Sequence, residues 1–389
     1  MAFFLFELFK ICGKIYKVVR KGDIMGVTAG IVGLPNVGKS TLFNAMTKSK
    51  ALCANYAFAT IEPNVGYVEL NDERLDRIVE IVKPRNIVKA SFSFTDIAGL
   101  VKGASLGEGL GNQFLSHIRQ VDAICHVIRC FEDKNIVHVN GKINPLNDLE
   151  VVNLELIFAD LEVIEKRTGK IAKKAQLKVD QEAIDEYNVL MKIKESLEKG
   201  ISARDIDLTK DEISLVKGYE FLSLKPMIYV LNIAEDEIKT GNSYTKEVME
   251  FAKSTNTKCL TISAKIEDEL AKLDDETKNI FMEELDLKES GLNRLAKEAY
   301  DLLGLATYFT AGEKEAKAWT FKKGMKAPEC AGIIHTDFEK GFIKAEVTSY
   351  NDFIKYGGLK EAREAGKMRL EGKEYIFQDG DIVLFRFNV

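Results

Sequence analysis

A glycine-rich segment near the start of the chain, residues 33–41, constrains the fold more than any other feature. Its sequence, GLPNVGKST, has the spacing G-x-x-x-x-G-K-[ST] and lies between a short apolar run at residues 28–32 and a helical pattern at residues 41–46. A strand, a glycine loop and a helix in this order direct several backbone N–H groups and the positive end of a helix at one point. Because such a point suits the phosphates of a nucleotide, the segment predicts a P-loop in an α/β domain.

The side chains of this loop predict separate roles in phosphate and metal binding. We expect Lys39 to reach the β- and γ-phosphates and to stabilise charge during phosphoryl transfer, and the Ser40 hydroxyl to be a ligand of Mg²⁺. The nucleotide-binding residues predicted from the loop are Asn36, Val37, Gly38, Lys39, Ser40 and Thr41.

Short apolar runs separated by helical patterns predict a mostly parallel sheet covered on both faces. These runs are residues 90–95, 123–130, 226–232 and 258–262. Three of them end at polar residues, Asp96, Asn232 and Ser263. Because ligands bind at the carboxyl ends of parallel strands, we assign these residues to the same candidate site as the P-loop.

The segment that begins at Asp96 has the D-x-x-G spacing, with Gly99 as its glycine. We expect the Asp96 carboxylate to hold the Mg²⁺ shell and the Gly99 N–H to contact the γ-phosphate and so sense its hydrolysis. Thr60 lies in the loop between the P-loop and this segment, where a threonine hydroxyl completes the coordination of Mg²⁺ when a γ-phosphate is present. The predicted metal ligands are therefore Ser40, Thr60 and Asp96.

The residue after Gly99 is Leu100, where Ras-type enzymes carry a glutamine that orients the attacking water. A leucine side chain cannot orient water. The glycine-rich segment that follows, residues 101–117, is expected to move as a lid and ends at His117. We take His117 as the candidate for placing the water, although an isolated histidine is more often a surface or helix-packing residue.

The segment Asn232–Glu235 stands where GTPases carry N-K-x-D, the motif that recognises guanine. Ile233 replaces the lysine, and Glu235 replaces the aspartate. Asn232 can pair with the amino group and N7 of adenine, and Ile233 offers an apolar wall to the ring. The backbone at Ser263 and Ala264 supports the base. These residue types impair guanine recognition and permit adenine, and they leave the choice of base open.

The remaining patterns divide the chain into parts. Residues 1–24 are an N-terminal extension or follow from a mis-chosen start codon, and residues 25–145 and 220–303 form the nucleotide-binding domain. Residues 146–219 mix charged and apolar side chains at helical spacing, which predicts an inserted arm of two long antiparallel helices. Residues 304–389 alternate strand-like runs with glycine turns and predict a separate small α+β domain.

Composition limits the classes of partner and compartment. With a net charge of −5 and 46 % hydrophobic residues, the chain is an ordinary globular protein rather than a nucleic-acid coat, although residues 322–326 form a local basic cluster. The six cysteines show no C-x-x-C pair, which favours reduced thiols in a cytoplasmic protein. No segment is long and apolar enough to span a bilayer.

Four motifs, at residues 33–41, 96–104, 109–119 and 232–235, resemble those of the YchF subfamily of Obg-like ATPases, and the resemblance extends from residue 25 to the end of the chain. The C-terminal part is similar to a TGS domain, a β-grasp module found in RNA-associated proteins. The resemblance implies a preference for ATP over GTP and His117 as the catalytic histidine. It also implies a K⁺ ion at Asn36, and a monomer that binds the large ribosomal subunit and contacts RNA through the TGS domain and the arm.

We therefore expect a slow Mg²⁺-dependent ATPase that converts ATP to ADP and phosphate as a conformational switch, binds the ribosome and regulates translation or a stress response. One alternative keeps the fold and changes the base, giving a GTPase of the ribosome-assembly type. Another alternative is a non-catalytic ribosome- or RNA-binding adaptor in which bound nucleotide has only a structural role.

Overall fold

The structure, a computed structural model, describes residues 27–52, 64–97, 110–138, 141–177 and 180–388. These residues form two units. One unit contains residues 28–68 and 93–299, and the other contains residues 69–92 together with the chain from Tyr300 onward. We call them the nucleotide unit and the C-terminal unit.

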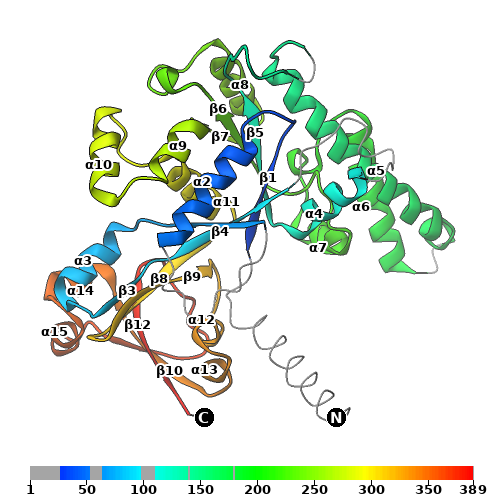
Figure 1. The fold of residues 1–389 in the computed structure, drawn as a ribbon. Coiled ribbons are helices and arrows are strands. Elements are labelled where there is room, and N and C mark those ends of the chain that lie inside the picture. Colours follow the sequence, from blue (N-terminus) through cyan, green and yellow to red (C-terminus); the bar gives the residue numbers. More distant parts are fainter. Residues whose placement is uncertain (1–26, 53–63, 98–109, 139–140, 178–179, 389) are drawn as a thin grey trace, which may run out of the picture. The chain divides into compact units, whose positions relative to one another are not determined.

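The nucleotide unit is built on a six-stranded sheet in the order β2-β4-β1-β5-β6-β7 (Figure 1). Its strands are β1 (Thr28–Val32), β2 (Val65–Glu69), β4 (Ser91–Asp96), β5 (Ala123–Arg129), β6 (Met227–Asn232) and β7 (Lys258–Ile262). β1 pairs in parallel with β4 and β5, β5 with β6, and β6 with β7. Every residue of β5 and β6 is buried, as expected for central strands covered on both faces. The predicted mostly parallel sheet is confirmed.

Among its described residues, the nucleotide unit has six helices outside the arm: α2 (Lys39–Leu52), α4 (Leu110–Gln120), α8 (Ser243–Ser254), α9 (Ala264–Leu270), α10 (Asp275–Glu284) and α11 (Gly291–Leu302), which runs into the C-terminal unit at Tyr300. Local chemistry determines where several of them begin. Asn242 caps α8 by accepting from the Thr245 N–H, and Asp274 caps α10 by accepting from the Thr277 N–H.

The predicted arm is present as two long helices. They are α5 (Pro145–Gln176) and α6 (Gln181–Glu198), followed by α7 (Lys210–Val216) and short 3₁₀ turns at Ala203–Asp205 and Lys217–Tyr219. Three buried isoleucines of α5, Ile157, Ile164 and Ile171, pack against α6 at every seventh position, as in a coiled coil. The ion pairs Arg167–Glu186 and Lys194–Glu165 join α5 to α6 in antiparallel register.

The C-terminal unit is a second six-stranded sheet in the order β11-β10-β12-β8-β9-β3. Its strands are β3 (Asn86–Val88), β8 (Leu305–Ala311), β9 (Glu315–Lys322), β10 (Phe342–Ser349), β11 (Arg369–Glu371) and β12 (Asp381–Phe387). Its helices are α3 (Glu73–Val82), α12 (Ala327–Ile334), α13 (Thr336–Lys340), α14 (Tyr350–Tyr356) and α15 (Leu359–Glu364). An aromatic cluster of Tyr308, Phe321, Phe377 and Phe385 forms much of its core.

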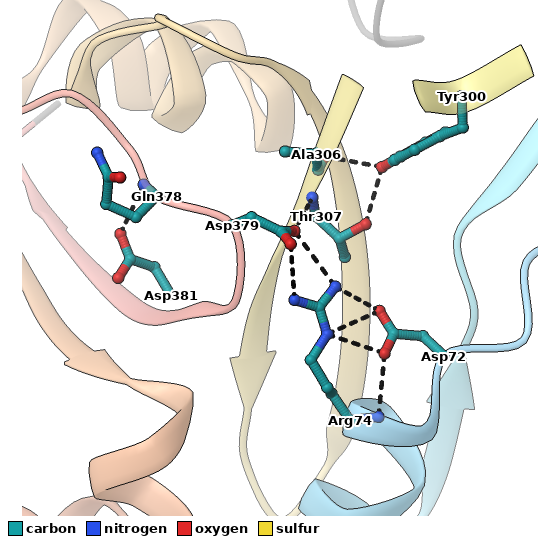
Figure 2. A network of polar contacts seen from close by, with 8 residues as sticks. All are labelled: Asp72, Arg74, Tyr300, Ala306, Thr307, Gln378, Asp379 and Asp381. Atoms are coloured by element: carbon teal, nitrogen blue, oxygen red, sulfur yellow. Dashed lines mark hydrogen bonds and ion pairs between the residues drawn. The ribbon is translucent and has the colours of Figure 1, made fainter. Parts of the chain in front are cut away.

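After β2, residues 69–92 form part of the C-terminal unit, to which they contribute α3 and β3. The chain then re-enters the nucleotide sheet through β4. β3 pairs in parallel with β9. At the start of α3, the Arg74 guanidinium donates to the carboxylates of Asp72 and Asp379, and Asp379 also accepts from the Thr307 N–H (Figure 2). The sequence patterns did not indicate this excursion. The domain boundaries drawn from the sequence stay a prediction.

The last predicted strand begins later than its sequence pattern indicated. Residues 376–385 form one strand-like run in the sequence, but β12 starts only at Asp381. Gly380 adopts a φ of +88°, and the buried Asp381 carboxylate accepts from the Gln378 N–H, so the preceding residues form a turn instead. Among the described residues, none of the helices combines the length and apolar character needed to cross a bilayer.

Candidate functional site

The loop between β1 and α2 has a backbone that only its own residue types allow. Gly38 has a φ of +98°, and a Cβ there would lie 2.2 Å from Nδ2 of Asn232. A Cβ on Gly33 would lie 2.4 Å from the carbonyl oxygen of Val127. Asn36 has a φ of 61°, in the left-handed region that asparagine tolerates better than most residues. The two glycines therefore let the loop fold closely against β5 and β6.

Lys39, the first residue of α2, is held inside this loop. Its side chain is buried, and its Nζ donates to the carbonyl oxygen of Leu34 at 2.7 Å. Burial lowers the pKa of Lys39 to about 8, and the Asp96 carboxylate partly opposes this effect. Burial raises the pKa of Asp96, and the Lys39 ammonium opposes that shift in turn. An ammonium group and a carboxylate therefore lie close enough to influence each other, beside the N-terminus of α2.

The residues beside Lys39 suit a hard cation. Ser40 is exposed at the second position of α2, and Asp96 is the last residue of β4, where it pairs with Ile31 of β1. Mg²⁺ is usually bound by one or two such oxygen ligands together with the phosphates of its substrate. Ser40 and Asp96 fit this donor set. The third predicted ligand, Thr60, lies outside the described residues, as does Gly99.

At the other end of the candidate site, Asn232 joins two loops. Its buried amide donates from Nδ2 to the carbonyl oxygen of Val37 at 2.8 Å and accepts at Oδ1 from the Ala264 N–H at 2.9 Å. The side chain therefore holds the P-loop to the loop that follows β7. One amide hydrogen and one oxygen lone pair are left for a base, so base pairing by Asn232 stays a prediction.

The other predicted base-side residues lie at the ends of β6 and β7. Ile233 and Ser263 are buried, and the Ser263 hydroxyl has no hydrogen-bond partner among the described residues. Glu235, in a short 3₁₀ turn (Glu235–Glu237), forms an ion pair with Lys265, the residue after Ala264. This ion pair was not predicted, because the sequence analysis assigned a role only to the backbone at Ser263 and Ala264.

The candidate water-placing residue lies on a helix of the same unit. His117 is exposed on the last turns of α4. The structure thus brings together the P-loop, Asp96, Asn232 and Ala264 at the carboxyl ends of β1, β4, β6 and β7. The role of His117 in placing water stays a prediction.

Sequence reasoning missed a loop that contacts the P-loop from β5. The Asn36 Nδ2 donates to the carbonyl oxygen of Val137 at 3.1 Å. The signal for this loop was Arg129, a charged residue at the end of a mostly apolar strand; its side chain is almost fully buried. Its guanidinium donates to three carbonyl oxygens of the loop, those of Phe131, Asp133 and Ile136.

Comparison with known families matches both units. Residues 28–159 match the family profile described as "50S ribosome-binding GTPase". Residues 305–388 match the YchF-GTPase C-terminal profile, which is described as a protein of unknown function. The first match contains the P-loop and Asp96, and the second covers most of the C-terminal unit.

Full-length relatives agree with these matches. "Ribosome-binding ATPase YchF" of Bacillus subtilis is 57 % identical over 367 residues, which cover 94 % of this chain and 100 % of the relative. The Escherichia coli O157:H7 protein of the same name is 52 % identical over 365 residues, with 94 % and 100 % coverage. A solved structure, the YchF GTPase of Schizosaccharomyces pombe, superposes with a TM-score of 0.84 at 38 % identity, covering 93 % of this chain and 98 % of that one.

Proposed function

We propose that this chain, which belongs to the YchF family, is a Mg²⁺-dependent ATPase that binds the ribosome and uses slow ATP hydrolysis as a conformational switch. The bacterial relatives carry the name "Ribosome-binding ATPase", which supports both the reaction and the partner. The name of the yeast structure gives GTPase instead, so the base preference is the part of the proposal that most needs a test.

The observation that carries the proposal is the placement of Lys39. Its ammonium rests on the Leu34 carbonyl at 2.7 Å, at the start of α2 and within the field of Asp96. An incoming polyphosphate offers this cation a stronger partner than a backbone carbonyl, because its oxygens are charged. Lys39 moves onto the phosphates, and the N–H groups at the start of α2 bind the same oxygens.

The other site residues take the roles predicted from the sequence. Ser40, Thr60 and Asp96 hold Mg²⁺, which when bound neutralises charge on the phosphate oxygens. Gly99 donates its N–H to the γ-phosphate, and His117 orients the attacking water. The motif spacing supports the roles of Thr60 and Gly99.

Several finer points of the proposal rest on the family resemblance. Asn36 contributes to a K⁺ site, the large ribosomal subunit is the partner, and the C-terminal unit and the α5–α6 arm contact RNA. The protein acts as a monomer in the cytoplasm. Four described cysteines, Cys125, Cys130, Cys259 and Cys330, are free thiols, which is consistent with that compartment.

Competition between ATP and GTP on the purified chain tests the base preference. We expect ATP to displace a fluorescent ATP analogue at lower concentration than GTP, in buffers with and without K⁺. A combined Ile233→Lys and Glu235→Asp variant restores the guanine-recognising residue types and should shift the preference toward GTP. Displacement of the analogue by GTP at concentrations equal to ATP would leave the GTPase alternative as the better reading.

Sedimentation with ribosomes separates the ATPase from the adaptor. The Lys39→Ala variant removes the phosphate-binding ammonium and should abolish hydrolysis. We expect it also to lose the ATP dependence of ribosome co-sedimentation. Unchanged co-sedimentation of both proteins, with and without ATP, would favour an adaptor in which nucleotide has only a structural role.

A further inference from the structure

The loop that follows β5, residues 131–138, links the P-loop to the beginning of the α5–α6 arm; we call it the linking loop. It leaves the nucleotide sheet beside β1, and the chain enters α5 at Pro145. It is held by contacts at both of its ends, by one contact with the P-loop, and by the Tyr244 hydroxyl, which donates to Glu132. These contacts are all inside the nucleotide unit.

Arg129 anchors the first part of the linking loop. This arginine is only 1 % exposed, and its guanidinium lies 4.6 Å from the centre of the Phe131 ring. Because it also donates to backbone carbonyls as far along as Ile136, the loop is tied to the end of β5 through several charge-assisted hydrogen bonds. A buried cation with these partners has no alternative position that keeps them, so this part of the loop is fixed.

A buried pair anchors the end of the loop to the arm. The His138 Nε2 and the Asp148 Oδ2 lie 2.8 Å apart, and the two residues are 7 % and 2 % exposed. Asp148 belongs to the first turn of α5, where its N–H donates to the carbonyl of Asn144, the residue that caps the helix. Because separating two buried polar groups is costly, the loop end and the first turn of α5 move together.

Between these anchors, the linking loop presents a backbone carbonyl to the P-loop. The Val137 side chain is 76 % exposed, so packing of that side chain does not set its position. Its carbonyl accepts from the Asn36 amide at 3.1 Å. The position of this carbonyl depends on its neighbours, of which His138 is held by Asp148. The orientation of the Asn36 amide therefore depends on a pair that reaches the arm.

We propose that the His138–Asp148 pair couples the nucleotide site to the arm, with His138 as a positioning residue that acts through the Val137 carbonyl on Asn36. This inference rests on the proposed function, because nucleotide is its input. A nucleotide that contacts the P-loop changes the Asn36–Val137 bond and, through it, the stability of the first turn of α5. Linkage requires the converse: breaking the pair changes nucleotide affinity.

Hydrogen–deuterium exchange of residues 145–152 in the full chain, with and without a non-hydrolysable Mg·ATP analogue, tests the coupling. We expect the analogue to change exchange in this first part of α5 in the wild type. The His138→Ala variant should lose most of that change and bind the analogue at least about fivefold more weakly. A factor of about five is the lower end of typical coupling between two sites. His138→Gln keeps a donor near the position of Nε2 and should restore both.

A matched control breaks a contact of the arm that does not lead to the P-loop. Glu186→Gln weakens the contacts of Glu186 with Arg167 and Tyr219. It should alter exchange near α6 and leave the nucleotide response of residues 145–152 unchanged. A merely structural role for His138 would instead lower protection equally with and without analogue and leave its affinity unaltered.

The outcomes separate the coupling from the proposed function. If the wild type binds and hydrolyses ATP but folded His138→Ala responds as the wild type does, the coupling is overturned and the ATPase assignment stands. Where His138→Ala does not fold, Asp148→Ala decides, because it removes the other half of the pair; an unchanged response and affinity overturn the coupling. If the wild type binds no nucleotide, both proposals fall, and that result is seen before any variant is made.

Discussion

Replacing Asn232 by alanine distinguishes a side chain that supports loops from one that reads the base. The substitution removes the hydrogen bond to the Val37 carbonyl at 2.8 Å and the one from the Ala264 N–H at 2.9 Å. Both partner residues are buried, at 1 % and 4 % exposure. The carbonyl and the N–H are therefore left without a partner in a place that water reaches poorly.

The expected loss follows from these two groups. A hydrogen bond contributes about 1 kcal/mol net, and leaving a buried partner unsatisfied costs about 1–3 kcal/mol. Allowing for partial relaxation of the loops, we expect a loss of about 3 kcal/mol, or roughly a hundredfold in the local folding equilibrium. Since the two loops frame the nucleotide, ATP and GTP should lose affinity by similar factors.

Urea unfolding and nucleotide competition together measure both effects. For the urea unfolding alone, Glu235→Gln serves as the control, because it changes a partly exposed side chain at the same end of the site and should alter stability by no more than about 0.5 kcal/mol. Our reasoning would be refuted if Asn232→Ala left stability unchanged and weakened ATP binding alone. That result would return Asn232 to the base-reading role predicted from the sequence.

Three further predictions follow from charged and titratable groups. Burial, together with the nearby cations Arg204 and Lys39, lowers the pKa of His126 to about 3. This histidine is therefore neutral in the folded chain, whereas in the unfolded chain it takes up a proton below its ordinary pKa of 6.5. The stability that neutral His126 contributes is present above pH 6.5 and is lost as the pH falls toward 3. Urea unfolding should therefore show about 1.4 kcal/mol less stability at pH 5.5 than at pH 7.5. An equal slope of stability against pH in His126→Phe would contradict this assignment. Because the pKa of Lys39 is lowered to about 8, nucleotide binding at higher pH must take up a proton. Calorimetry should therefore show nucleotide affinity falling roughly 20-fold between pH 7.5 and 9.5. A flat profile of affinity against pH would exclude a neutral Lys39 in the free chain. Arg74→Ala should destabilise the C-terminal unit by about 1 kcal/mol in urea unfolding, since its ion pairs are partly screened by water, and a neutral result would show that Asp379 is held by Thr307 alone.

The parts of the fold that could be predicted from the sequence are those fixed by local chemistry. The P-loop needs Gly33 and Gly38 for its backbone, and both are visible in the motif. The arm could be predicted because apolar residues of α5 repeat at coiled-coil spacing. Asp96 could be placed because a polar residue that ends an apolar strand lies at the ligand-binding edge of a parallel sheet.

What could not be predicted depends on contacts between distant segments. β3 has only three residues, too few for a strand pattern, and its partner β9 lies more than two hundred positions later. The amphipathic pattern of α3 predicts a helix but not which of the two sheets it covers. The hydrogen bond from Asn36 to the Val137 carbonyl likewise cannot be read from the sequence, because a backbone carbonyl accepts a hydrogen bond whatever the side chain of its residue is.

The excursion of residues 69–92 has a practical consequence for anyone who wishes to cut this protein apart. A fragment that starts at Tyr300 would lack the edge strand β3 and the helix α3, whose Leu75 and Ile78 are almost completely buried. A fragment that ends before Tyr300 would keep those apolar residues but lose the sheet that they cover, and their exposure would favour aggregation. Soluble halves require residues 69–92 to be excised from one fragment and grafted onto the other.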